Sequence, residues 1–200
     1  MERIGTIVQL QIQTASLKVG EMPRRYDPAA LLSLGAVTVT SEGVSGQHED
    51  GSAIVDVHHT RHPQSKNRGG ANGVSLGFTS HYRAMRERFG DHLADGIAGE
   101  NILIETDHRF QDDDLAGGIV IAAGSGARLM LRPVIAAAPC VEFARYALRF
   151  PADARPDGTV TEVLRFLGAG MRGFYVANGG EPAVVTLGDQ VLSARPRPKP

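Results

Sequence analysis

The chain contains a single cysteine, Cys140, and its surroundings favour a chemical role. It follows Pro139 at the end of a predicted strand and opens the segment 141–148, whose apolar residues recur at helical spacing. Unpaired N–H groups at the start of a helix stabilise a thiolate relative to a thiol. A buried cysteine also serves as a small apolar residue in many proteins. The position of Cys140 in the sequence leaves both interpretations open.

The densest group of potential metal ligands is formed by Asp56, His58, His59 and His62. Neighbouring residues on a strand face opposite sides of the sheet, so His58 and His59 do not easily reach one ion. A zinc site needs three or four convergent ligands. We therefore expect these histidines to form local hydrogen bonds. A histidine-only zinc site, or one with Cys140 as a distant fourth ligand, is the less favoured alternative.

A long polar segment, 60–73, carries Lys66 and Arg68 together with three glycines. Its glycines and prolines exclude a regular element of any length, so we predict a loop. Cationic side chains beside exposed backbone N–H groups suit the binding of a phosphate, although ordinary surface loops have the same composition. Arg132 and Arg172 are the alternative phosphate-binding residues, because they flank predicted strands near Cys140.

The segment Gly99-Glu100-Asn101 places a turn glycine and two polar side chains directly before an apolar strand. Taken alone, Glu100 and Asn101 would only close that turn, because short polar side chains bond to nearby backbone groups.

Composition limits the class of protein. The chain has 200 residues, 42% of them hydrophobic, which is enough for one well-buried domain. Its 21 basic and 22 acidic residues leave a net charge of -1, so no overall positive field attracts nucleic acid. The first residues lack the pattern of a signal peptide, and no apolar run is long enough for a membrane span. We expect a cytoplasmic protein without nucleic-acid or membrane partners, and its one cysteine excludes an internal disulfide.

The elements that must position these residues are mostly strands. The 24 glycines and 11 prolines exceed the average and are typical of short strands joined by turns. Alternating or β-branched segments predict strands at 4–16, 36–40, 53–58, 101–106, 119–123, 127–137, 173–177, 183–187 and 190–194. Helical spacing and capping residues predict helices at 28–34, 81–89, 141–148 and 159–167.

These elements predict a mainly β fold with a few helices. One domain over 1–194 is the economical interpretation, and a closed or nearly closed β-barrel would remove exposed sheet edges. The basic, proline-rich tail at 195–200 is expected to be extended and mobile.

Four short motifs, in this order, resemble the MOSC family, named for the C-terminal domain of molybdenum cofactor sulfurases. The similarity covers about 43–189 and includes the predicted helix at 81–89. The motifs are Gly99-Glu100-Asn101, Ala138-Pro139-Cys140, Arg172-Gly173-Phe174-Tyr175 and Leu187-Gly188-Asp189.

The resemblance implies a stand-alone, MOSC-like β-barrel that binds the molybdenum-pterin cofactor, with Cys140 as the metal ligand and catalytic residue. A thiolate is a soft donor that suits such a metal. Reduction of N-hydroxylated substrates is an activity found in similar stand-alone members. An external electron donor would then be needed, because the sequence has no flavin, haem or iron-sulfur motif. The residues expected to hold the cofactor are Lys66, Arg68, His58, His59, Glu100, Asn101, Arg132 and Arg172.

Two other functions stay open at this point. In the first, Cys140 is a sulfur carrier that receives a transient persulfide from a sulfur donor. In the second, the barrel is not catalytic and only binds a partner or a small ligand. Pyridoxal phosphate is not expected, because it belongs to the separate sulfurase domain found upstream in larger relatives.

Overall fold

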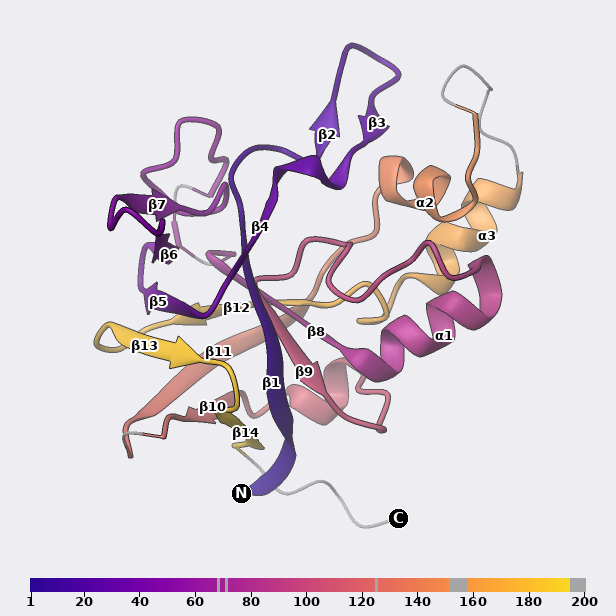
Figure 1. Ribbon diagram of the computed structural model, residues 1–200. Helices are drawn as coiled ribbons and strands as arrows, with labels where there is room; N and C mark the ends of the chain where they lie inside the picture. Colours follow the sequence, from indigo (N-terminus) through magenta and orange to yellow (C-terminus); the bar gives the residue numbers. More distant parts are fainter. Residues whose placement is uncertain (68, 71, 125, 152–157, 195–200) are drawn as a thin grey trace.

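The structure is a computed structural model, and it describes residues 1–67, 69–70, 72–124, 126–151 and 158–194. Within these residues, seven strands close into a barrel (Figure 1), in the order β14, β10, β11, β12, β8, β9 and β1, with β1 pairing back to β14. The seven strands are β1 (Glu2–Gln13), β8 (Val74–Phe78), β9 (Ile102–Glu105), β10 (Ile119–Ala122), β11 (Arg128–Ala136), β12 (Phe174–Asn178) and β14 (Gln190–Ser193). The predicted mainly β fold and its barrel are confirmed.

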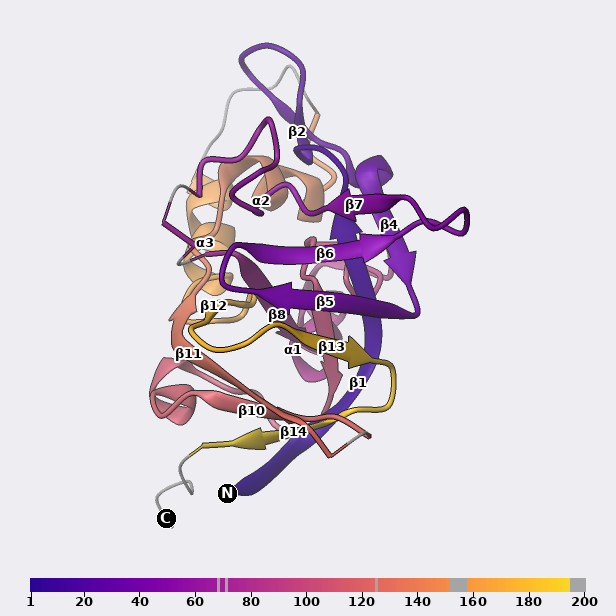
Figure 2. The same ribbon diagram turned by 90° about the vertical axis from the view of Figure 1, so that its left-hand side faces the viewer.

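Smaller elements surround the barrel. A four-stranded sheet of β13 (Ala183–Thr186), β5 (Ala36–Thr40), β6 (Gly43–Gln47) and β7 (Ala53–Val55) covers one side, as Figure 2 shows. The helices α1 (Thr79–Phe89), α2 (Val141–Ala147) and α3 (Gly158–Phe166) lie on the opposite side in Figure 1. The hairpin of β2 (Lys18–Val19) and β3 (Arg25–Tyr26) projects beyond the end of β1 and contacts α2.

Helix α1 connects β8 to β9, which pair in parallel, whereas the other paired strands are antiparallel. A parallel pair cannot be joined by a tight hairpin, so a crossover is required. The crossover brings the start of β9, with the residues just before it, to the barrel end where β1 finishes, since Ile102 pairs with Leu10.

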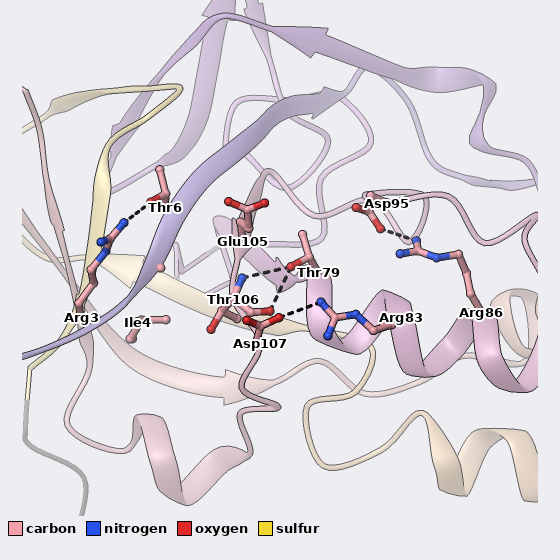
Figure 3. A pocket seen from close by; sticks show the side chains of 11 residues that line it. Arg3, Ile4, Thr6, Thr79, Arg83, Arg86, Asp95, Glu105, Thr106 and Asp107 are labelled. Carbon is pink, nitrogen blue, oxygen red and sulfur yellow. Dashed lines mark hydrogen bonds and ion pairs between the residues drawn. The ribbon is translucent and has the colours of Figure 1, made fainter.

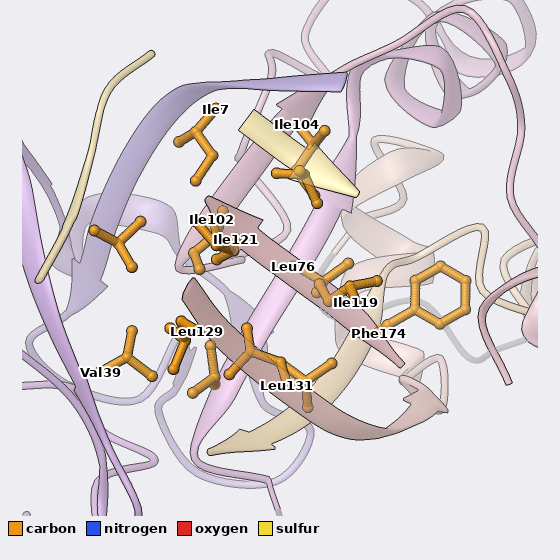
Figure 4. Close-up of a cluster of buried hydrophobic side chains, with 14 of the residues drawn as sticks. Ile7, Val39, Leu76, Ile102, Ile104, Ile119, Ile121, Leu129, Leu131 and Phe174 are labelled. Carbon is orange, nitrogen blue, oxygen red and sulfur yellow. The ribbon is translucent and has the colours of Figure 1, made fainter. Parts of the chain in front are cut away.

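The barrel interior is filled with aliphatic side chains (Figure 4). Ile7, Leu76, Ile102 and Leu131 are almost fully buried there, together with residues of the covering sheet such as Val39. Removing this apolar surface from water is the main stabilising contribution to the fold. A second cluster, which includes Tyr26, Tyr82 and Phe143, lies beneath the helices. We therefore look for polar side chains that could bind a ligand at the barrel ends and in the connecting segments.

The predicted helix at 28–34 is wrong. Asp27 does cap a helical turn, because its Oδ1 accepts a hydrogen bond from the Ala29 N–H at 3.0 Å, but the 3-10 turn ends at Ala30. The next residues form strand β4 (Leu31–Leu34), which pairs with the last four residues of β1. Strand β9 pairs with β1 only as far as Leu10, so the backbone groups beyond it need another partner. Tertiary pairing overrides the helical pattern here.

Strands β6 and β8 were not predicted. Every residue of β8 is buried, so it lacks the alternation that marks a half-exposed strand. Strand β6 contains two glycines, which signal a turn in sequence. At Gly46 a Cβ would come very close to the end of the Leu34 side chain on β4, so a larger residue would force that side chain to move.

The helices at 81–89, 141–148 and 159–167 are confirmed to within two residues at either end. Among the described residues, none of the helices has the length and apolar character needed to cross a bilayer. The predicted mobile tail at 195–200 lies outside the described residues.

His81 on α1 makes stability depend on pH. Its side chain is 1% exposed and packs against the rings of Phe78 and Phe174, and burial lowers the pKa of the imidazole to about 4. The unfolded chain binds a proton near pH 6.5, so stability is lost as the pH falls from 6.5 toward 4. Because of His81, we expect the free energy of unfolding to be about 2 kcal/mol lower at pH 5 than at pH 7. Urea titrations at both pH values, with His81→Leu as the comparison, test this, and an equal pH dependence in both proteins would contradict it.

Candidate functional site

Cys140 lies where the chain leaves β11 and enters α2. It is the N-cap residue of α2, with extended backbone angles, and its carbonyl accepts the first helical hydrogen bond from the Ala144 N–H at 3.0 Å. Phe143 and Ala144 anchor the helix in the cluster beneath it. The Cys140 side chain forms no capping hydrogen bond and is half-buried, so its sulfur is available to a ligand.

Cys140 borders a pocket of about 230 Å³ at the end of the barrel where β1 finishes. Its walls come from the end of β1, the β2–β3 hairpin, the segment after β7, the residue before α2 and the start of β12. We call it the Cys140 pocket. Its lining residues are Gln13, Ser16, Leu17, Lys18, Arg24, Tyr26, Val57, His58, Gln64, Lys66, Ala138, Cys140, Arg172 and Tyr175.

The Cys140 pocket is strongly cationic. Four of its lining side chains, Lys18, Arg24, Lys66 and Arg172, carry positive charge, and none of its lining residues within the described chain is a carboxylate. Glu142, just outside the lining, offsets part of this charge at 3.7 Å from Lys18 and 3.5 Å from Arg24. The excess of positive charge selects for an anionic ligand although the whole chain is nearly neutral.

Arg172 is held rigidly at the base of the pocket. Its Nη2 donates a hydrogen bond to the Ala98 carbonyl at 2.7 Å, and its guanidinium lies 5.7 Å from the centre of the Phe143 ring. Both contacts restrict the side chain before a ligand arrives, which reduces the entropy cost of binding.

Glu100 does not line the pocket but lies beneath it, 2% exposed. Its Oε2 accepts a hydrogen bond from the Tyr82 hydroxyl at 2.6 Å, and its charge acts on Arg172. Burial raises the pKa of this carboxyl, and the positive charge of Arg172 opposes the shift. Gly77 and Gly173 make room for Glu100, since a Cβ at either position would come within 2.9 or 3.2 Å of the Glu100 side chain. Gly173 also has a φ of +113°, which favours glycine.

Asn101 is also buried beneath the pocket. Its side-chain amide donates to Asp56 Oδ2 at 2.8 Å, and its Oδ1 accepts hydrogen bonds from the N–H and hydroxyl of Ser75, both at 2.9 Å. Asp56 in turn contacts His58, which does line the pocket. The Gly-Glu-Asn segment therefore supports the pocket from below, and Glu100 and Asn101 are not among its lining residues.

His58 and His59 lie apart, but in the turn after β7 and not on the predicted strand, which ends at Val55. His58 faces the Cys140 pocket, whereas His59 is fully buried outside it, with its Nδ1 accepting a hydrogen bond from the Arg61 N–H at 3.2 Å. Burial lowers the pKa of His59. No group of three or more metal-binding side chains occurs in the part of the chain that the structure describes. A zinc site formed by these histidines is therefore not supported.

The remaining predicted binding residues divide as follows. Lys66 and Arg172 line the Cys140 pocket together with His58. Arg132 is exposed on β11 and is not among the lining residues. Arg68 lies outside the described residues.

The sequence interpretation missed several pocket residues, above all Lys18 and Arg24. They lie more than a hundred residues before Cys140 and reach it because the β2–β3 hairpin packs against α2. The run of basic residues at 18–25 was the available signal, but nothing in the sequence connected it to Cys140.

A larger cavity of about 560 Å³ lies at the opposite end of β1 (Figure 3). Its three arginines already have partners in the chain. Arg3 donates to Thr6, Arg83 pairs with Asp107 at 3.0 Å, and Arg86 pairs with Asp95. The cavity is lined by both signs of charge and has no cysteine or histidine among its described lining residues, so it is the weaker candidate.

Alkylation of the native protein tests whether Cys140 is accessible. We expect iodoacetamide to label the folded protein at close to the rate of an exposed thiol, because the sulfur borders an open pocket. An inorganic dianion such as sulfate should slow labelling by occupying the cationic walls. Intact mass measured over time gives the rate, and labelling that requires unfolding would show a structural thiol.

Comparisons with known proteins show the fold and little more. No family model matches the chain, and no curated protein does. The structure of the YuaD protein from Bacillus subtilis is similar, with a TM-score of 0.58 at 13% identity over 95% of this chain and 96% of that one. A structure described only as a hypothetical protein has a TM-score of 0.57 at 12% identity, over 97% and 70% of the two chains. YiiM from Geobacillus stearothermophilus has a TM-score of 0.49 at 14% identity, over 96% and 73%. At 13% identity, this similarity shows that the chain shares the fold of YuaD.

Proposed function

We propose that the chain is a stand-alone MOSC-type protein whose Cys140 pocket binds the molybdenum-pterin cofactor. The observation that carries the proposal is one soft thiol in a pocket with four cationic side chains and no carboxylate among its described lining residues. A thiolate suits molybdenum, and the cations suit the phosphate of the cofactor. The MOSC-like fold supports the same interpretation.

Each side chain of the pocket has a defined task in this function. The Cys140 sulfur holds the metal, and Lys18, Arg24 and Lys66 neutralise the anionic end of the cofactor. Arg172, fixed by Ala98, offers a directed hydrogen-bond donor at the base. The Gln64 amide nitrogen can donate to the polar edge of a heterocycle, whereas the Gln13 amide nitrogen already donates to the Gly99 carbonyl at 2.6 Å. The bound cofactor would supply the redox chemistry for reducing an N-hydroxylated substrate, with electrons from an external donor.

A second function uses the same residues without a metal. Cys140 acts as a sulfur carrier: its thiolate attacks the outer sulfur of a donor persulfide, R–S–SH, and the products are the Cys140 persulfide and the donor thiolate. The cationic walls are compatible with this alternative too, because they attract an anionic sulfur donor. The third possibility is a barrel that binds a ligand without catalysis. It requires neither a bound molybdenum cofactor nor a persulfide on Cys140.

Analysis of freshly purified protein separates the three functions. Metal content is measured together with intact mass after expression in a host that makes the cofactor. Molybdenum with a pterin supports the first function. A gain of one sulfur atom that is lost on treatment with a thiol supports the second. Absence of both would leave the non-catalytic barrel.

Lys66 is expected to contribute to binding the anionic end of the cofactor. We expect Lys66→Ala to weaken binding of a phosphate-bearing pterin by about 1.5 kcal/mol or more, roughly tenfold, if the contact is direct. Stability should barely change, because Lys66 is exposed. Arg132→Ala is the matched control, since it removes an exposed charge that does not line the pocket. Titration at fixed ionic strength measures both variants, and equal affinities would remove Lys66 from the site.

A further inference from the structure

A buried carboxylate lies directly behind His58. Asp56 is fully buried, and both of its oxygens accept hydrogen bonds. Oδ2 accepts from the Gln13 N–H and from the Asn101 amide, both at 2.8 Å. Oδ1 accepts from the His58 N–H at 2.8 Å and lies 2.9 Å from His58 Nδ1. Three of these four contacts come from groups that only donate, so Asp56 acts as an ionised acceptor.

This arrangement fixes the His58 ring. An ionised carboxylate has no proton to give, so His58 Nδ1 must carry the proton that the two atoms share. The other ring nitrogen, Nε2, has no hydrogen-bond partner among the described residues, and the ring borders the Cys140 pocket beside Tyr175, with the two ring centres 5.8 Å apart. Nε2 is therefore the nitrogen available to a ligand.

The charges around His58 oppose each other. Asp56 lies behind the ring, with its Oδ1 2.9 Å from Nδ1. On the pocket side the charged and titratable lining groups are Lys18, Arg24, Lys66, Arg172, Cys140, Tyr26 and Tyr175. An anion in the pocket can accept a hydrogen bond from Nε2 only when that nitrogen carries a proton, because Nδ1 is already engaged with Asp56.

We propose that the Cys140 pocket binds its anionic ligand together with a proton on His58 Nε2, and that Asp56 and Asn101 are the positioning residues that hold His58 for this role. The imidazolium then donates a hydrogen bond to the anion from Nε2 while Nδ1 donates to Asp56. The proposal rests on the proposed function only in requiring that an anion enters the pocket, whether a cofactor phosphate or a free oxyanion.

Inorganic sulfate is a suitable probe, because it stays a dianion throughout the range in which histidine titrates. Its affinity is measured by NMR titration between pH 6.5 and pH 8.5 at fixed ionic strength. We expect affinity to fall with rising pH, approaching tenfold per pH unit at the upper end, since one proton is taken up with each anion. In His58→Gln this pH dependence should disappear while weaker binding persists. His62→Gln, outside the pocket lining, is the matched control and should keep it.

The tautomer is measured in the ligand-free protein from the ring nitrogen shifts of His58. We expect the proton on Nδ1 at pH 8.5, and loss of this preference in Asp56→Asn. A proton on Nε2 in the ligand-free protein, absence of sulfate binding, or an affinity that does not change with pH would each overturn the proposal. A pH dependence that survives in His58→Gln and vanishes in Cys140→Ser would assign the proton to the thiol and overturn it as well. None of these outcomes depends on molybdenum content, so the proposed function stands or fails separately.

Discussion

Replacing Cys140 by serine is expected to abolish molybdenum retention and persulfide formation together. Serine keeps nearly the same volume but is a far weaker ligand for a soft metal and cannot hold a sulfane sulfur. The side chain is half-buried and makes no capping hydrogen bond, so the variant should fold normally. Metal analysis, intact mass and thermal unfolding of the two proteins provide the measurement.

Tyr175→Phe is the matched control for this experiment. Tyr175 lines the same pocket, and phenylalanine keeps its ring. The Tyr175→Phe variant should therefore retain its molybdenum or its persulfide sulfur, while Cys140→Ser should lose it. Undiminished molybdenum or sulfur in the serine variant would contradict both the cofactor-binding and the sulfur-carrier functions, because each depends on the sulfur of Cys140.

Replacing Asp56 by alanine should have the largest effect on stability. The change leaves the Gln13 N–H, the Asn101 amide and the His58 N–H without their buried acceptor. Each such loss costs about 1–3 kcal/mol, and removing one partner from a buried charged network typically costs about 3–5 kcal/mol. We expect the free energy of unfolding, measured by urea denaturation at pH 7, to fall by about 3–5 kcal/mol.

Asp50→Ala provides the comparison. Asp50 makes the same local contact two residues ahead, since its Oδ1 accepts from the Ser52 N–H at 2.8 Å, but it is exposed. Water replaces the lost acceptor there, so the free energy of unfolding should change by about 1 kcal/mol or less. If the free energy of unfolding fell by similar amounts in the two variants, the burial of Asp56 beneath the pocket would not be the reason for its contribution to stability.

The site therefore combines a cationic upper layer that meets the ligand with a buried polar layer that holds the upper layer in place. Glu100 acts on Arg172, and Asn101 acts on His58 through Asp56. Substitutions in the lower layer should disturb binding and stability together, whereas substitutions of Lys66 should disturb binding alone.

Local pattern in the sequence was sufficient for the fold class. Strand β12 and the first part of β11 alternate in burial because one face is buried in the barrel. Strand β1 was predicted from alternating residue types at its end, although its last four residues are all buried in the structure. Helix α1 was predicted for the corresponding reason at helical spacing. Cys140 was a candidate reactive residue because it is the single cysteine and stands before a predicted helix, and both facts are local. Its expected catalytic and metal-binding role came from the resemblance to the MOSC family and not from these local facts.

Tertiary structure decided which residues share the site. Leu31–Leu34 became a strand because the end of β1 needed a partner, and Lys18 and Arg24 reached Cys140 because the β2–β3 hairpin packs on α2. Glu100 and Asn101, predicted as cofactor contacts, became the support beneath the pocket because β9 begins beside the end of β1. Local periodicity records how deeply each residue is buried, but it does not record which distant segment lies opposite. That depends on strand pairing between residues far apart in the chain.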